Sequence, residues 1–282
     1  MKKKKSKFRD WLPWLGLLTG LLIVAWYPAT EAMDAWRRSQ IGSQLETQVQ
    51  EQDDSVIRQL LQQAHAYNDR LAGKEPEIPE EQILPYEDQL MVRKGDQAFG
   101  MIVIPKLGLN MPIYHGTSET VLMAGTGHLK GTSLPVGGED THASVSAHTG
   151  MQHMRGFDEL DQMKSGDIFG IRILGMTYAY KVESVEVVLP DEMDALEIQE
   201  GKDMVTLITC TPYGINDHRL LVHGIRTEVP EGYFDAKADP VVVLKSPRIW
   251  PFVLGTAIVV LLVIVTVVRN RKKRRKGKKT AL

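Results

Sequence analysis

Two uncharged runs of about twenty residues constrain this chain more than any other feature. Residues 11–30 contain no charged side chain, and neither do residues 249–268. Twenty helical residues rise about 30 Å, which matches the hydrocarbon core of a bilayer. A peptide group without a hydrogen-bond partner is unstable in lipid, so such runs form helices. The sequence therefore predicts a transmembrane anchor at 11–30 and a transmembrane helix at 249–268.

Basic residues flank both runs on their outer sides. Lys and Arg make up six of the first ten residues and nine of the last fourteen. Such clusters stay cytoplasmic, so the tails 1–10 and 269–282 are expected inside the cell and residues 31–248 outside it. The predicted location is a cell membrane crossed twice, with an extracellular body. A cleaved signal peptide is the alternative for the first run, and a buried core helix for the second.

The charge of the body excludes one class of partner. The chain has 34 basic and 35 acidic residues, and the two tails hold 15 of the basic ones. Residues 11–268 therefore keep 19 basic against 34 acidic residues. An acidic body repels a phosphate backbone, so nucleic acid is not an expected partner. Basic ends next to apolar runs instead indicate a membrane.

The stretch between the two runs changes composition twice. Residues 31–73 are polar and glutamine-rich with apolar residues at helical spacing, which predicts a helical stalk; a solvated stalk is favoured over any catalytic role. Residues 74–99 contain prolines among glutamates, as linkers do. Residues 100–228 carry the β-prone sequence, and residues 229–248 are a second linker.

Seven β-prone runs follow one another after residue 100, and Gly, Pro and Asp separate many of them. They are 101–104, 111–114, 143–147, 168–173, 178–188, 205–209 and 220–225. Seven or eight short strands predict a mainly β fold, either a barrel or a sandwich. The only short helix candidates in this region are 156–163 and 191–196.

Cys210 is the only cysteine, so no disulfide can form within the chain. Outside the cell a lone thiol is an accident, an intermolecular link or a nucleophile. It ends the apolar run 205–209, and Arg219 opens the next strand nine residues later. Antiparallel neighbours joined by a short loop would place the two side by side. The guanidinium could then stabilise an oxyanion. A buried thiol with a surface arginine is the alternative.

A thiol nucleophile needs a base or a cation, and eight histidines are available. His148 follows the run 143–147, so it lies at a strand end, as Cys210 does. His128, in a glycine-rich loop, is the second candidate. His218 adjoins Arg219 but should point the opposite way on a strand. No spacing of His, Cys or Asp predicts a metal site, and no glycine-rich phosphate loop is present, so no cofactor is expected.

Two long motifs resemble one family. The run 206–224, TLITCTPYGINDHRLLVHG, resembles the signature of sortases, the membrane-anchored cysteine transpeptidases of Gram-positive surfaces. The run 127–150, GHLKGTSLPVGGEDTHASVSAHTG, is similar to the histidine region of the class C, pilin-polymerising branch. The resemblance covers about residues 66–228 and implies a closed eight-stranded β barrel with short helices. It implies Cys210 as nucleophile, His148 as general acid and base, and Arg219 as stabiliser of substrate or oxyanion.

The resemblance also implies the reaction and its partners. A sortase cleaves an LPXTG-like sorting signal between Thr and Gly through a Cys thioester, then transfers the acyl group to an amine. A pilin lysine is the expected acceptor, which would make the reaction pilus assembly. A cell-wall peptide amine is the alternative, and a thiol hydrolase or a non-catalytic membrane scaffold are further ones.

Class C sortases often carry a lid with an Asp-Pro-aromatic motif. The corresponding stretch here has no Asp before its proline, and Pro85 and Tyr86 are the nearest candidates. The alternative is an ordinary prolyl linker. His223 stands where many relatives carry an arginine, and no role is predicted for it.

Overall fold

The computed structural model describes residues 8–93, 95, 98–150, 155–192, 194–234, 251 and 254–265. The chain divides into two units. One comprises residues 1–33 and 240–282, and the other comprises residues 34–239. The predicted cytoplasmic tails, except for residues 8–10, lie outside the described residues, as does most of the predicted linker 229–248.

The first unit is helical where it is described. Helix α1, Phe8–Gln50, begins in it and includes the predicted anchor, and residues 254–265 of the second apolar run are helical. Among the described residues, no helix combines the length and the apolar character needed to cross a membrane. Residues 249, 250, 252, 253 and 266–268 of the predicted second span are outside the described part.

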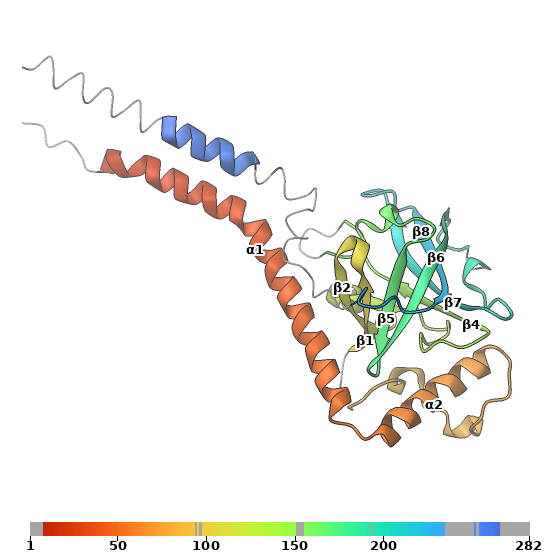
Figure 1. Ribbon diagram of the computed structural model, residues 1–282. Helices are drawn as coiled ribbons and strands as arrows, with labels where there is room; N and C mark the ends of the chain where they lie inside the picture. The colour runs from red at the N-terminus through yellow and green to blue at the C-terminus, as the bar shows by residue number, and fades with distance from the viewer. Residues whose placement is uncertain are drawn as a thin grey trace, which may run out of the picture. The chain divides into compact units, whose positions relative to one another are not determined.

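The second unit is built on a closed eight-stranded barrel (Figure 1). Its strands follow the order β1-β2-β3-β4-β7-β8-β6-β5. The β2–β3 and β4–β7 pairs are parallel and the others antiparallel. The strand bounds are β1 Ala98–Ile104, β2 Leu109–His115, β3 Thr126–His128, β4 Thr141–Ser146, β5 Ile168–Ile173, β6 Met176–Val188, β7 Asp203–Thr211 and β8 His218–Thr227.

Seven of these strands coincide with the seven β-prone runs, which confirms the predicted barrel. The strand that the sequence pattern does not indicate is β3, which is only three residues long and contains a glycine. The candidate helix at 156–163 is only the short 3-10 turn η4, Leu160–Gln162, and the candidate at 191–196 is η5, Asp194–Leu196. A short helix, α3 Glu119–Ala124, was not predicted.

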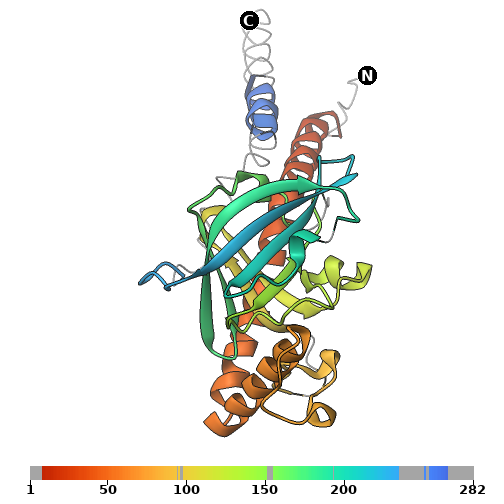
Figure 2. The same ribbon diagram turned by 90° about the vertical axis from the view of Figure 1, so that its right-hand side faces the viewer.

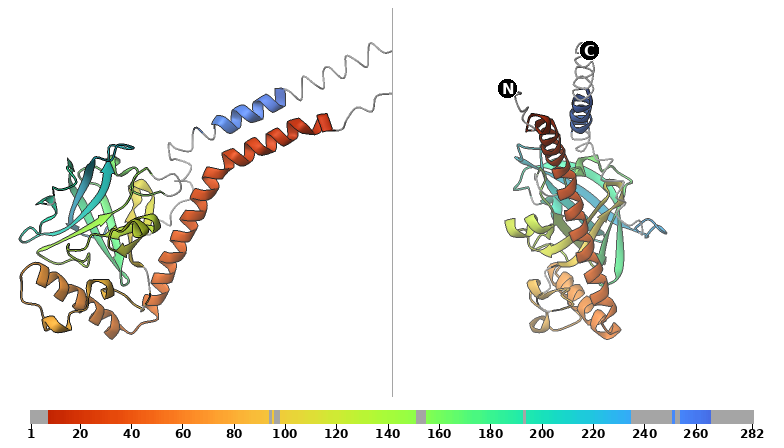
Figure 3. Two further views of the ribbon diagram at one scale, coloured as in Figure 1. Left: turned by 180° about the vertical axis from the view of Figure 1, so that it is seen from behind. Right: turned by 90° about the vertical axis from the view of Figure 1, so that its left-hand side faces the viewer.

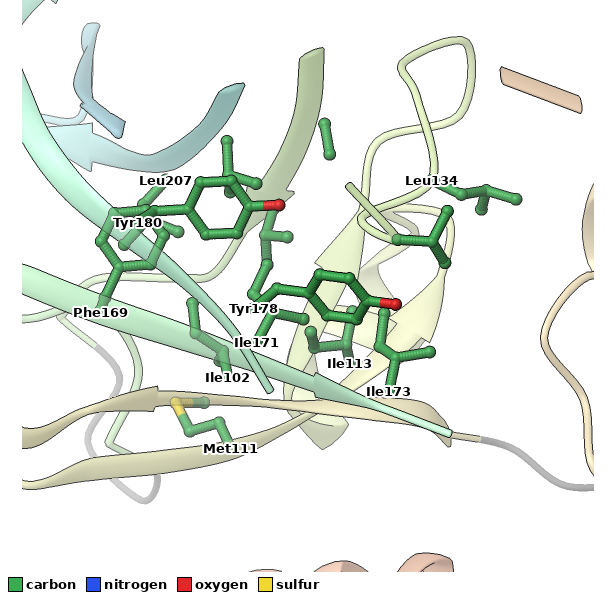
Figure 4. Close-up of a cluster of buried hydrophobic side chains, with 14 of the residues drawn as sticks. Ile102, Met111, Ile113, Leu134, Phe169, Ile171, Ile173, Tyr178, Tyr180 and Leu207 are labelled. Atoms are coloured by element: carbon green, nitrogen blue, oxygen red, sulfur yellow. The ribbon is translucent and has the colours of Figure 1, made fainter. Parts of the chain in front are cut away.

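Alternate side chains of the strands fill the barrel interior. Figure 4 shows part of this core, with Tyr178 and Tyr180 of β6 among aliphatic side chains from β1, β2, β5, β7 and the loop that carries Leu134. Phe169 and Tyr180 are stacked, with ring centroids 5.7 Å apart. Burying such large apolar surfaces is the main favourable term in folding, and it fixes which residues of each strand point inward.

Helix α2, Asp54–Leu71, corrects the expectation of a solvated stalk. Ala64, Ala66, Tyr67 and Asn68 are buried in it. The Asn68 side chain donates to the Leu134 carbonyl (2.9 Å) and accepts from the Leu134 amide (2.7 Å). Figures 2 and 3 show α2 across one end of the barrel, beside the segment that carries η1, Glu80–Gln82, and η2, Tyr86–Asp88. The polar composition of the segment led to the wrong expectation because only one face of the helix is buried.

The short turn η3, Pro105–Leu107, lies between β1 and β2.

Gly224 on β8 allows the stacked rings to approach the strand. A Cβ atom there would lie 2.6 Å from Cε1 of Phe169 and 3.0 Å from Cβ of Tyr180. We predict that Gly224→Ala lowers the free energy of unfolding by about 1–3 kcal/mol, because a ring must move. Urea denaturation followed by far-UV circular dichroism measures it. In a Phe169→Leu background the added loss should be smaller, and an equal loss in both backgrounds would contradict this explanation.

Candidate active site

Cys210 and Arg219 are direct cross-strand partners. They face each other in the antiparallel β7–β8 register, as the nine-residue spacing predicts. The thiol is free and partly exposed. The Arg219 guanidinium donates from Nη1 to the carbonyl oxygens of Asn216 (3.2 Å) and His218 (3.0 Å). The hairpin loop therefore holds the cation beside the strand position that carries the sulfur.

His148 leaves the sheet at the same level. Strand β4 runs parallel to β7, and Ser146 pairs with Ile208. The next residue is tied on both sides: the Ala147 amide donates to the Ile208 carbonyl (3.1 Å), and Thr209 Oγ1 donates to the Ala147 carbonyl (2.8 Å). Continuing this register by two residues brings position 148 level with position 210. Three neighbouring strands thus bring positions 148, 210 and 219 to one end of the sheet.

The backbone after His148 is held by a tight return of the chain. The His148 carbonyl accepts from the Phe157 amide at 2.9 Å. Gly156 passes so close that an added Cβ would lie 2.1 Å from this carbonyl oxygen. The Asp158 carboxylate accepts from the amides of Gly150 (2.6 Å) and Gly156 (3.0 Å). The histidine thus has a fixed main chain although it lies in a loop.

Glu119 is a neighbour of the imidazole that sequence reasoning missed. Its carboxylate lies 3.3 Å from Nε2 of His148, whose side chain is 22% exposed, whereas that of Glu119 is 75% exposed. Glu119 opens α3, whose cap is Ser118, with its hydroxyl accepting from the Val121 amide at 3.4 Å. The two side chains form an ion pair only when the imidazole is protonated, and water screens the exposed carboxylate. No spacing in the sequence links two residues so far apart.

The second histidine candidate, His128, is a core residue. It is fully buried, with Nδ1 2.9 Å from the Tyr86 hydroxyl and Nε2 2.8 Å from the Ser133 carbonyl. Burial lowers the pKa of His128 to about 4. It is therefore neutral at physiological pH, and both ring nitrogens are bonded to groups other than Cys210. His218 Nδ1 lies 2.8 Å from Asp217 Oδ1, so this imidazole is paired with a neighbouring carboxylate and not with Cys210.

Pro85 and Tyr86, the predicted lid residues, belong to a segment anchored elsewhere. The buried Tyr86 hydroxyl accepts from the Gly116 amide and lies 2.9 Å from the His128 carbonyl. The centroid of its ring lies 4.8 Å from that of His115 and 5.3 Å from the Lys130 ammonium nitrogen. Burial raises the pKa of this hydroxyl, which keeps it protonated. Pro85 directly precedes turn η2. These contacts join the segment to β3 and the end of β2, rather than to β7 or β8.

Within the part of the chain that is described, no three His, Cys, Asp or Glu side chains are grouped so as to hold a metal ion.

Comparison with known proteins points to one family. The sortase domain model matches residues 102–227. The chain is 30% identical over 128 residues to sortase A of Streptococcus agalactiae serotype III (strain NEM316), which covers 44% of this chain and 51% of that protein. It is 26% identical over 133 residues to sortase D of Bacillus subtilis (strain 168), covering 46% and 64%. The chain thus spans about half the length of the first relative and under two thirds of the second.

Solved structures are matched over more of the chain. Sortase C1 from Streptococcus agalactiae superposes with a TM-score of 0.62 at 39% identity, covering 67% of this chain and 99% of that one. Sortase C of Streptococcus pneumoniae gives 0.60 at 38% identity, with 67% and 97% covered. Sortase C from Clostridium perfringens SM101 gives 0.56 at 41% identity, with 67% and 98% covered.

The pairing of Cys210 with Arg219 makes a prediction about thiol reactivity. A nearby cation favours the thiolate, which is the form that alkylating agents attack. We expect Arg219→Gln to slow alkylation of Cys210 by iodoacetamide at pH 7 by about threefold or more. Mass spectrometry follows it without ambiguity because the chain has one cysteine. Arg226→Gln, on the same strand beside Tyr178, should leave the rate unchanged. An unaltered rate in Arg219→Gln would mean that the guanidinium does not act on the sulfur.

Proposed function

The chain belongs to the sortase family, and on that premise we propose that it is a membrane-anchored cysteine transpeptidase. It cleaves an LPXTG-like sorting signal between Thr and Gly and transfers the acyl group to an amine. The observation that carries this proposal is the register of β7. On one side β7 pairs with β8, where Cys210 faces Arg219, and on the other side it pairs with β4, whose end is followed by His148. A nucleophile, a cation and an acid–base group at one sheet end are what acyl transfer requires.

The first half-reaction forms a thioester. The Cys210 thiolate adds to the Thr carbonyl carbon, and the carbonyl electrons move to oxygen, where Arg219 stabilises the negative charge. The intermediate collapses with cleavage of the Thr–Gly C–N bond. The His148 imidazolium gives its proton to the departing Gly amine. The products are an acyl-thioester on Cys210, a neutral His148 and a free amino terminus.

The second half-reaction releases the enzyme. A neutral amine attacks the thioester carbon, and the C–S bond breaks to return the thiolate. Neutral His148 takes the proton that the amine loses, which restores the imidazolium. A new amide bond joins the two substrates, and no oxidant, metal or cofactor is needed to balance either step.

A pilin lysine is the acceptor that we propose. The superposed solved structures are sortases C; the S. agalactiae enzyme is that of a pilus island, and the pneumococcal one is described with pilin substrate specificity. These sortases C are 38–41% identical to this chain, whereas sortase A of S. agalactiae is 30% identical over 128 residues. This difference favours pilus assembly over attachment of surface proteins to the cell wall.

We also propose the two-pass topology, with both termini cytoplasmic and the barrel outside. Its support is the pair of uncharged runs with basic residues on their outer flanks. A lid role for Pro85 and Tyr86 remains a prediction from resemblance, since their contacts lie on β2 and β3.

Trapping of the acyl-enzyme tests the chemistry. We expect the full-length protein, mixed with a Leu-Pro-x-Thr-Gly peptide, to gain the mass of the acyl fragment, mapped to the tryptic peptide that contains Cys210. Cys210→Ala should show no adduct, because no other thiol is present. If Cys210→Ala retained full cross-linking of surface proteins in cells, a non-catalytic scaffold would be the correct assignment.

Separate acceptors distinguish the remaining alternatives within the same experiment. A pilin that supplies a lysine should give a ligated product, whereas a cell-wall peptide amine should not. Preference for the wall amine would assign the chain to surface-protein attachment. Equal product release with and without any amine would indicate a thiol hydrolase.

The protonation states predict a pH profile. A free thiol titrates near 8.5 and a free imidazole near 6.5, so only about one molecule in a hundred of an unperturbed pair holds thiolate and imidazolium together. We expect kcat/KM to follow a bell-shaped curve governed by two macroscopic pKa values. His218→Gln, at an exposed histidine paired with Asp217, should keep the curve. A rate that still rises beyond pH 10 would contradict a required imidazolium.

A further inference from the structure

A chain of short hydrogen bonds crosses four strands on the outer face of the barrel. His142 Nδ1 lies 2.8 Å from the Glu197 carbonyl, and His142 Nε2 lies 2.6 Å from Thr206 Oγ1. The same Thr206 oxygen lies 2.7 Å from His223 Nδ1. His223 Nε2 lies 2.9 Å from Glu186 Oε1. The proposed reaction uses none of these groups.

The members of this chain are shielded from water except at one end. His142 and Thr206 are fully buried and His223 is 5% exposed, so water is not available to replace a missing partner. The Glu186 side chain is 47% exposed. An unpaired nitrogen in the buried part would therefore lose hydrogen bonding on folding.

Counting hydrogens shows that the neutral groups are one short. The four contacts need four hydrogens, since each lies within hydrogen-bond distance. Neutral His142, neutral His223 and the Thr206 hydroxyl supply one each. The Glu197 carbonyl and an ionised Glu186 only accept. With three hydrogens, two lone pairs would face each other at one of the contacts. All four bonds form only if the chain holds one additional proton.

The surroundings indicate which group carries this proton. Burial lowers the pKa of His142, the hydrogen bond to the Glu197 carbonyl raises it by less, and a charge on His223, whose ring centroid is 6.1 Å away, lowers it. His142 is then neutral, donating to Glu197 and accepting from Thr206. Thr206 in turn accepts from His223 Nδ1, and His223 Nε2 donates to Glu186. This direction is the one that remains once His142 is neutral, and it makes His223 an imidazolium paired with a carboxylate.

Few other ionisable groups face His223 in the described contacts. Strand β6 presents Glu186, and Ser184 as the cross-strand partner; β7 presents Thr206, and β4 presents His142. Glu197, after η5, contributes its backbone carbonyl. Arg219 lies on the same face four residues along β8.

We propose that His142, Thr206, His223 and Glu186 form a binding site for one proton, which joins strands β4, β7, β8 and β6. Two of these strands carry Cys210 and Arg219, and β4 leads to His148. Among the described residues, these side-chain hydrogen bonds are the only ones that link the four strands on this face. Loss of the proton would break one of them and weaken the packing of the strands that carry the candidate active site.

The site gives stability a definite sign with pH. The folded state holds one proton that the unfolded chain has released above about pH 6.5, the value of a free imidazole. Stability is therefore fully present below that pH and falls as pH rises until the folded site deprotonates. Within this window the folding equilibrium constant should fall by up to about tenfold per pH unit. His115 and His128, whose pKa values burial lowers to about 4, act only at lower pH and with the opposite sign.

Glu186→Gln separates the proton from the hydrogen bonds. The amide of glutamine donates to a neutral His223 Nε2 and thereby supplies the fourth hydrogen without a charge. We expect the full-length variant to fold, and its folding constant to lose the dependence on pH above about 6.5, as urea midpoints measure. Glu183→Gln, an exposed acid on the same strand, should keep the wild-type dependence. Equal dependence in Glu186→Gln and wild type would overturn the proposal.

A second measurement uses the wild-type protein and so does not depend on a variant that folds. In nitrogen-15 NMR at pH 7.5, the His223 ring should show both nitrogens protonated, and the His142 ring should show the neutral form with its proton on Nδ1. A neutral His223 ring at this pH would refute the proton site. Titration of the His223 signals should then follow the same midpoint as the loss of stability.

Discussion

The register of β7 against its two neighbours is the constraint on which the candidate site depends. Successive residues of a strand point to opposite faces, so a slip of one residue would turn Cys210 toward the barrel interior. Thr209 and Leu207, inward-facing and buried, oppose such a slip on one side. The parallel pairing with β4 fixes the other side, because the Ala147 amide and Thr209 hydroxyl bonds lock the chain one residue before His148. The geometry of the chemistry is therefore set by core packing.

Closure of the barrel allows such a site to stand at a sheet end. A closed sheet has no unpaired edge, so β7 and β4 gain partners on both sides and their ends stay rigid. Rigid strand ends then fix the positions of the short loops attached to them, whereas the same loops on a mobile support would move. The Gly156 contact with the His148 carbonyl extends this rigidity one step into the loop.

The sequence predicts the features that depend on residues close together in the chain, and it misses those that depend on contacts between residues far apart. Strand positions and the Cys210–Arg219 pairing follow from local alternation and a nine-residue spacing, and both were correct. Strand β3 is too short to show a period, and the burial of α2 depends on a surface provided by Leu134, sixty-six residues away. Glu119 and the His142–His223 chain were invisible for the same reason, since their partners meet only after the barrel closes.

The histidines of this one barrel show how neighbours decide protonation. His128 is buried against a tyrosine hydroxyl and a carbonyl, with no carboxylate bonded to it, and its pKa falls to about 4. His223 is almost as buried but ends a hydrogen-bond chain that lacks one hydrogen and meets a carboxylate. His148 is partly exposed and lies beside the exposed carboxylate of Glu119. The same side chain thus serves as core packing at His128, while it is the proposed proton site between strands at His223 and the proposed acid–base group at His148. In each case the number of hydrogens that its partners supply, and the access of water, make the difference.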